Sequence, residues 1–134
     1  TGAAAVAELA ARHGVTAEPV AGEPQAAALV RAAVRGDGSD PSAGRFLDVL
    51  ADRVALGAAA VVSVLDPGCV VLAGETGRAG GDTLAARVRD RLARMSPLAT
   101  EVRAGTLGGG AVLRGALLTA RDRAQDDLFG PRGH

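Results

Sequence analysis

The sequence predicts an α/β protein in which a pair of helices precedes alternating helices and strands. Apolar side chains recur at intervals of three and four residues in several segments, which is typical of amphipathic helices. Two short runs rich in β-branched residues follow turn-forming Pro or Ser-Pro sequences, which is typical of strands. At 134 residues the chain is the size of one domain. We expect a single subdomain over residues 1–134, made of a helical pair (1–38), an α-β-α-β-α segment (39–130) and a tail (131–134).

The helical pair is predicted over residues 2–13 and from Pro24 to just before Gly36. Pro suits the first turn of a helix, and Gly14 is a natural C-terminal cap for the first one. We expect His13 to interact with the last carbonyls of that helix. The apolar positions that define the two helices are Val6, Leu9 and Ala10, then Ala26, Leu29, Val30 and Val34.

The longest helix is predicted over residues 42–64, after a cluster of turn formers at 36–41. Ser39 or Asp40 can cap this helix. Its charged residues all lie in the first half, and from Val54 onward the side chains are apolar or small. We therefore expect the second half to be buried on every side.

A first strand is predicted over residues 69–73, and its uninterrupted apolar character indicates cover on both faces. A Gly-containing loop should follow over 74–81, and Asp82 or Thr83 should open a helix that ends at Arg94. This helix is expected to bury Leu84, Val88 and Leu92 and to expose Arg87, Arg89, Asp90 and Arg91.

A second, parallel strand is predicted over 100–104, then a flexible loop over 105–110 and a last helix over 111–125. Two short parallel strands do not form a stable sheet by themselves. The chain also begins at Thr1 without a Met. We therefore expect the remaining strands to come from a missing part of the same protein or from another chain.

Composition excludes several classes of function. Fifteen Arg and no Lys balance fifteen acidic residues, so no net positive charge favours nucleic acid or an anionic membrane. A single Cys cannot form an internal disulfide, and no apolar run is long enough to span a bilayer, so a cytoplasmic protein is expected. Cys69, expected to be a core residue, and the distant His13 and His134 offer no metal-ligand spacing.

The glycines after each predicted strand are candidate ligand loops, because backbone amides at a helix start can bind phosphate. Gly74, Gly77, Gly80 and Gly81 do not match the dinucleotide-binding pattern, and Asp82 adds an anion. In the second loop, Ala and Val stand where a P-loop requires Lys and Ser or Thr. A plain flexible turn is favoured for both.

Two stretches, LDPGCVVLAGE (65–75) and LGGGAVLRGALL (107–118), resemble the C-terminal part of the ROK family of repressors and sugar kinases. The resemblance implies the C-terminal part of an actin-like, ribonuclease-H-like ATPase domain, in which the loop after the first strand lies near the adenosine of ATP in kinase members. Those members carry two glycines where this chain has Ala73-Gly74. The resemblance therefore implies a vestigial nucleotide loop with Gly74 and Glu75 as its remaining residues, and no bound cofactor.

This sequence contains no motif that corresponds to the family's catalytic Asp, its sugar-binding residues, its zinc segment or the helix-turn-helix of its repressors. We interpret the chain as the non-catalytic effector and oligomerisation segment of a sugar-responsive ROK-type transcriptional repressor. Its partners would be a second copy or the missing N-terminal part, which would bind the sugar and the DNA. The alternatives are the C-terminal half of a ROK sugar kinase and an independent α/β interaction scaffold.

Overall fold

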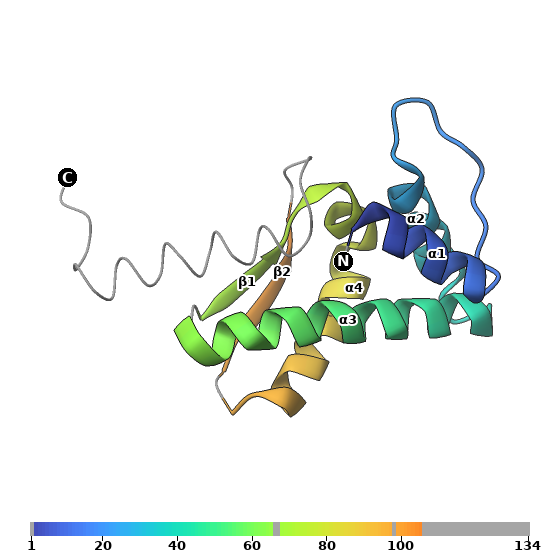
Figure 1. Cartoon of the computed structure of the whole chain (residues 1–134). Coiled ribbons are helices and arrows are strands. Elements are labelled where there is room, and N and C mark those ends of the chain that lie inside the picture. The colour runs from blue at the N-terminus through green and yellow to red at the C-terminus, as the bar shows by residue number, and fades with distance from the viewer. Residues whose placement is uncertain (1, 66–67, 98, 106–134) are drawn as a thin grey trace.

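The computed structural model describes residues 2–65, 68–97 and 99–105. Within these ranges the elements are α1 (Ala3–Arg12), α2 (Gln25–Gly36), α3 (Pro41–Leu65), β1 (Cys69–Leu72), α4 (Gly74–Met95) and β2 (Glu101–Ala104). Figure 1 shows α3 running along the molecule, with α1 and α2 near its beginning and the two strands near its end. The α/β class is confirmed in this coarse form. The predicted helix over 111–125 and the tail at 131–134 lie outside the described residues.

The end of α1 follows the local prediction. Gly14 has a φ of 69°, and the N–H groups of Gly14 and Val15 donate to the carbonyls of Ala11 and Ala10. This is the Schellman arrangement that favours glycine after a helix. The Nδ1 atom of His13 lies 3.0 Å from the carbonyl oxygen of Leu9, so the expected contact with a terminal carbonyl is confirmed.

The start of α3 is also as predicted, with Asp40 as its cap. The Asp40 carboxylate accepts a 2.9 Å hydrogen bond from the backbone N–H of Ser42, and Pro41 occupies the first helical position. The expectation that the second half of α3 is buried on every side was wrong. Leu56 is 69% exposed and Ala60 is exposed, because the neighbouring helices in the described part of the chain cover only one side of α3.

The core lies between α3 and the other helices. Phe46, Leu47 and Leu50 of α3 are fully buried. The predicted buried residues of α4 meet them, and α1 and α2 close the cluster with Val6, Leu9 and Val30. With so few aromatic residues, the core consists mainly of Ala, Val and Leu packed between closely spaced helices.

The two strands pair in parallel, as predicted, with Cys69 opposite Glu101 and Leu72 opposite Ala104. Val70 and Leu72 are buried, whereas Cys69 and Val71 are only half-buried. The expectation of a strand covered on both faces, with Cys69 in the core, is therefore not met within the described residues, where one face of the sheet is packed. The apolar run did not distinguish a one-sided strand from a two-sided one.

The predicted loop over 74–81 was wrong, because α4 starts at Gly74 immediately after β1. Glycine composition suggested a loop, but here the glycines allow a helix to lie close to the strand. Inside α4, Gly81 departs from helical geometry, with φ 53° and ψ −149°, and it divides the helix into a short first part and a longer second part. None of the helices in the described part of the chain combines the length and apolarity needed to cross a membrane.

Candidate functional site

The candidate nucleotide loop is a tight junction between β1 and α4. Ala73 is the N-cap of α4 in extended conformation, and Gly74 has a φ of 83°. An L-residue rarely adopts that φ, so glycine is required for the chain to reverse from strand into helix at this point. The junction places the amino-terminal turn of α4 against the carboxyl end of β1.

Three backbone segments converge on the carbonyl of Leu72. The N–H of Gly105, at the end of β2, donates a 2.9 Å hydrogen bond to this oxygen. A Cβ added at Gly77 would lie only 2.2 Å from the same atom, and one added at Gly105 would lie 3.0 Å from it. The carboxyl ends of the two parallel strands therefore meet here, which is the position where ligands bind in many α/β proteins.

The structure places the two predicted site residues side by side in the first turn of α4. Gly74 is buried, and Glu75, 31% exposed at its side chain, forms a 2.6 Å ion pair with Arg78. The Glu75 carboxylate already lies at the positive end of the helix dipole, where a phosphate would otherwise be favoured. In this arrangement the glycines serve close packing, and the nearest anion is supplied by the chain itself. Their role in binding nucleotide stays a prediction.

Cys69 lies at the beginning of β1, on the less covered face of the sheet. Burial, with a smaller contribution from the adjacent Glu101, raises the pKa of the Cys69 thiol, while Arg103 lowers it. The thiol is therefore held in its protonated form, which is the opposite of what a nucleophilic cysteine needs. Within the described ranges, no group of three His, Cys, Asp or Glu side chains is arranged to hold a metal ion.

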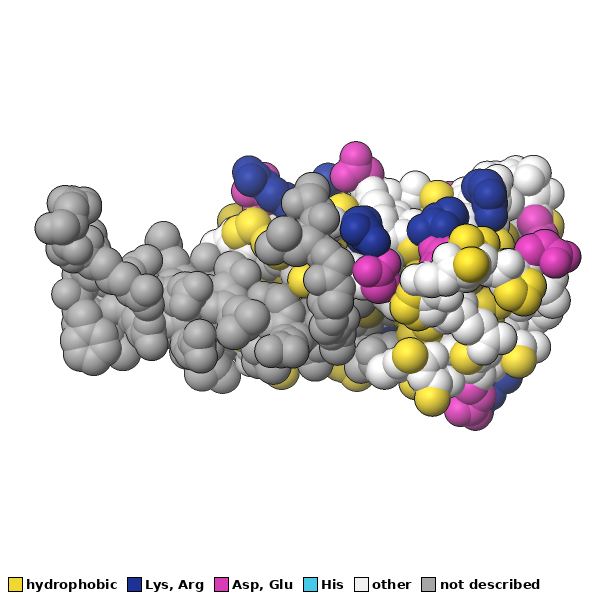
Figure 2. All heavy atoms as spheres, turned by 90° about the horizontal axis from the view of Figure 1, so that it is seen from above, with side chains coloured by type: hydrophobic (Ala, Val, Ile, Leu, Met, Phe, Trp, Pro, Cys, Tyr) yellow, Lys and Arg dark blue, Asp and Glu magenta, His cyan; other side chains and the backbone are white. Residues whose placement is uncertain are grey.

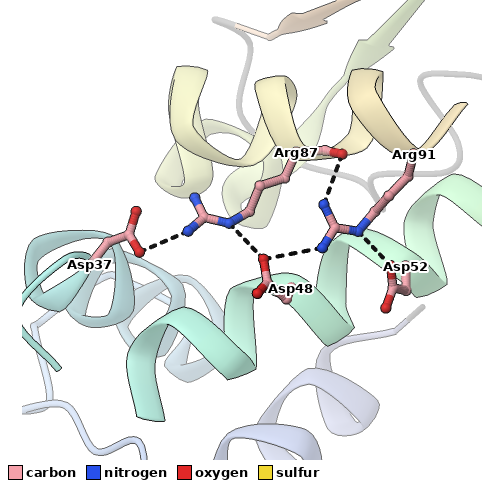
Figure 3. Close-up of polar contacts among 5 residues, drawn as sticks. All are labelled: Asp37, Asp48, Asp52, Arg87 and Arg91. Atoms are coloured by element: carbon pink, nitrogen blue, oxygen red, sulfur yellow. Dashed lines mark hydrogen bonds and ion pairs between the residues drawn. The ribbon is translucent and has the colours of Figure 1, made fainter. Parts of the chain in front are cut away.

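A row of ion pairs connects α4 to α3 and to the end of α2 (Figure 3). Arg87 contacts Asp37 at 2.7 Å and Asp48 at 3.0 Å, and Arg91 contacts the same Asp48 oxygen at 3.1 Å and also Asp52. Burial opposes the charge on Arg87, but hydrogen bonds to Asp37 and Asp48 outweigh it, so the pKa of Arg87 is raised.

The predicted exposure of Arg87 and Arg91 was therefore wrong. Their side chains are only 22% and 13% exposed, because each lies across the surface of α3. Asp48, at 52% exposure, accepts from both guanidinium groups and so forms the centre of the row. The function of this row is structural: it fixes how α4 lies on α3.

Two other surface features were not predicted from the sequence. One is the apolar stripe on α3, which we define as the half-buried Val49 and the exposed Leu56 and Ala60, with Arg53 between Val49 and Leu56 on the same side. The other is a depression of about 420 Å³ between α2 and the segment that joins α1 to it, with Glu23, Arg31 and Arg35 in its lining. Arg31 and Arg35 lie one helical turn apart, and this spacing would have indicated that both face the same depression. The apolar periodicity of α2 identifies only the buried side of the helix.

Figure 2 looks down on this joining segment, which arches above the helices in Figure 1. Hydrophobic, basic and acidic side chains are interspersed over the helical pair in that view. The surface there is thus mixed in character, without a single-sign field that would steer a polyanion.

No family model, no curated protein and no solved structure matches this chain.

Proposed function

We propose that this chain is the C-terminal effector and oligomerisation segment of a sugar-responsive ROK-type transcriptional repressor and is not catalytic by itself. The order of its elements supports the proposal: a long helix, a strand, a helix and a parallel strand follow one another in the order that the resemblance implies. The sugar and the DNA would be bound by parts of the repressor outside this chain.

The observation that carries the oligomerisation role is the apolar stripe on α3. Val49, Leu56 and Ala60 lie seven and four residues apart and so share one side of the helix. Leu56 is 69% exposed in the middle of a 25-residue helix whose other large apolar side chains, where described, are buried or, at Val49 and Val61, half-buried. Burying an exposed leucine in an interface contributes about 1.5 to 3 kcal/mol. A second copy of α3 offers the same side chains for reciprocal packing, as a two-fold interface requires.

The junction between β1 and α4 supports the non-catalytic part of the proposal. Gly74 is buried against the strand, and Arg78 holds the carboxylate of Glu75. Ala73 carries a Cβ where a second glycine would allow a ligand to approach the backbone more closely. This geometry favours a packing role for the loop.

Sedimentation velocity tests the oligomerisation role directly. The wild-type chain should associate to a dimer as its concentration rises through the micromolar range, and Leu56→Glu should remain monomeric. Met95→Glu is the matched control, because Met95 is also an exposed large apolar residue, at 44%, but lies at the end of α4. A wild-type chain that stays monomeric, or a Leu56→Glu variant that still dimerises, would contradict the proposal.

Hydrogen exchange separates the regulator from the sugar kinase. Adding Mg-ATP should leave the amide exchange of residues 74–80 unchanged in the regulator, whereas protection of these amides would favour the kinase alternative. The gene upstream of the Thr1 codon provides the complementary test. A helix-turn-helix encoded there supports the repressor, and a kinase catalytic half without one refutes it.

A further inference from the structure

The depression between α2 and residues 15–24 has the character of a small-molecule site. Its volume of about 420 Å³ lies within the range of ligand pockets, and a second hollow of about 180 Å³ adjoins it and shares Val20, Glu23 and Ala28. Its wall combines small apolar side chains with two carboxylates and two guanidinium groups. Neither the strand-end loop nor the α3 stripe involves these residues.

Glu23 is the most unusual group in this wall. Its side chain is only 9% exposed, and its Oε1 lies in an ion pair with Arg31. Neither carboxylate oxygen has a partner in hydrogen-bonding geometry among the described residues. Arg31 is thus the described group that offsets the charge of this buried carboxylate, and a cationic hydrogen-bond donor from outside the chain can take its place. Arg31 covers the carboxylate with a side chain that is itself 44% exposed, and it can turn aside.

Arg35 provides the opposite charge at the other part of the wall. It follows Arg31 by one helical turn, is exposed, and forms no ion pair with the described residues. A guanidinium group binds a carboxylate through two parallel hydrogen bonds. The wall therefore carries a buried acceptor and an available cationic donor, with Val20, Ala28 and Ala32 as apolar surface in the same depression.

We propose that this depression binds a small zwitterion, an α-amino acid with an aliphatic side chain. The ammonium group of the ligand would donate to Glu23 and its carboxylate would accept from Arg35, with Arg31 moving from Glu23 towards the ligand carboxylate. The aliphatic side chain would pack against Val20 and Ala28. Binding is non-covalent, and the proposal does not depend on the ROK interpretation.

Three probes with the same aliphatic group test the charge requirement: L-leucine, isoamylamine, which lacks the carboxylate, and isocaproate, which lacks the ammonium group. Titration followed by amide NMR shifts of Val20, Ala28 and Ala32 locates binding. L-leucine should bind at least about tenfold more tightly than either single-charge probe. Absence of binding in the millimolar range, or equal binding of isocaproate, would overturn the proposal.

Substitutions that remove one charge at a time test the assigned residues. Glu23→Gln and Arg35→Gln should each weaken L-leucine binding by about tenfold or more. Arg35 is exposed, so its variant remains folded even where Glu23→Gln affects stability. Arg53→Gln is the control, because Arg53 is an exposed arginine of α3 outside the depression, and it should bind as the wild type does. Full affinity in Arg35→Gln, or loss in Arg53→Gln, would refute the assignment.

Discussion

Replacing Gly77 by Ala tests whether the glycines after β1 serve packing. The added Cβ would lie 2.2 Å from the carbonyl oxygen of Leu72 and 2.6 Å from its carbon, so α4 or β1 must move by roughly 1 Å. The obstacle is backbone, which cannot rotate away as a side chain can. The same oxygen accepts the hydrogen bond from Gly105 that joins the ends of the two strands, so the displacement disturbs that bond as well.

The expected change is a loss of about 2 kcal/mol in the free energy of unfolding. Overpacking of this kind costs up to about 3 kcal/mol, and the better helix propensity of Ala returns about 1 kcal/mol. Gly44→Ala is the matched control, because Gly44 is also helical and the nearest described atom to its added Cβ is Asp37 Oδ1 at 3.7 Å. That variant should gain about 0.5 to 1 kcal/mol.

Urea denaturation followed by circular dichroism measures both variants. Gly77→Ala should have a lower midpoint and Gly44→Ala a higher one, with the same slope as the wild type in both cases. A Gly77→Ala variant as stable as Gly44→Ala would show that the start of α4 can move away from β1 without loss of stability. The interpretation of these glycines as packing residues would then be wrong.

Three further predictions concern other parts of the fold. Asp48→Asn should lower the free energy of unfolding by about 1 to 3 kcal/mol, because Asp48 is the shared acceptor of two largely buried arginines. A double-mutant cycle with Arg91→Gln should show coupling between the two residues, and strictly additive changes in the free energy of unfolding would contradict the row of ion pairs. Gly81→Ala should cost about 1 to 3 kcal/mol in urea denaturation through its φ of 53° alone, and an unchanged midpoint would refute this. The raised pKa of Cys69 should make its alkylation by iodoacetamide slower in the folded than in the unfolded chain, and Glu101→Gln should accelerate alkylation of the folded chain. Equal alkylation rates in the folded and unfolded wild-type chain would contradict the effect of burial on the pKa. Because the folded thiol holds its proton more tightly, its contribution to stability is complete below the pKa of the unfolded thiol and is lost as pH rises through the folded pKa.

The element order could be predicted from the sequence because its signals are local. The Pro and Gly residues that end each helix, and the Asp40 cap, act within a few residues of their own position. The helical period of Leu84, Val88 and Leu92 likewise identifies a buried side without knowledge of its partner. For these features, local chemistry and tertiary structure agree.

The errors arise where a residue's role depends on a distant contact. Gly77 allows α4 to lie close against the Leu72 carbonyl, and a glycine-rich composition cannot distinguish such close packing from a flexible loop. Arg87 and Arg91 are covered because Asp48 lies 39 and 43 residues earlier in the chain. Leu56 continues the apolar run of α3 but faces outward, and only the placement of the other helices reveals that.

The candidate strand-end residues were predicted from resemblance, and the depression beside α2 was not predicted at all. Glu23 precedes Pro24 at the start of a predicted helix, where a negative charge is favourable because of the helix dipole. Its burial results from the segment over residues 15–24, whose path has no periodic signal. Arg31 and Arg35 likewise resemble ordinary exposed residues of an amphipathic helix until the joining segment brings Val20 and Glu23 beside them.

The two ends of α4 are held by forces of different kinds. Its first turns rest on β1 through close packing of glycine against the Leu72 carbonyl, a steric contact that salt does not screen. Its later turns bury Leu84, Val88 and Leu92 in the core and are held in addition on α3 and on the end of α2 through Arg87 and its acidic partners. Surface-proximal ion pairs weaken as the Debye length shortens to about 3 Å in molar salt. Ionic strength therefore acts on the attachment of the helical pair, which carries the Glu23 depression, and leaves the strand-end junction unchanged.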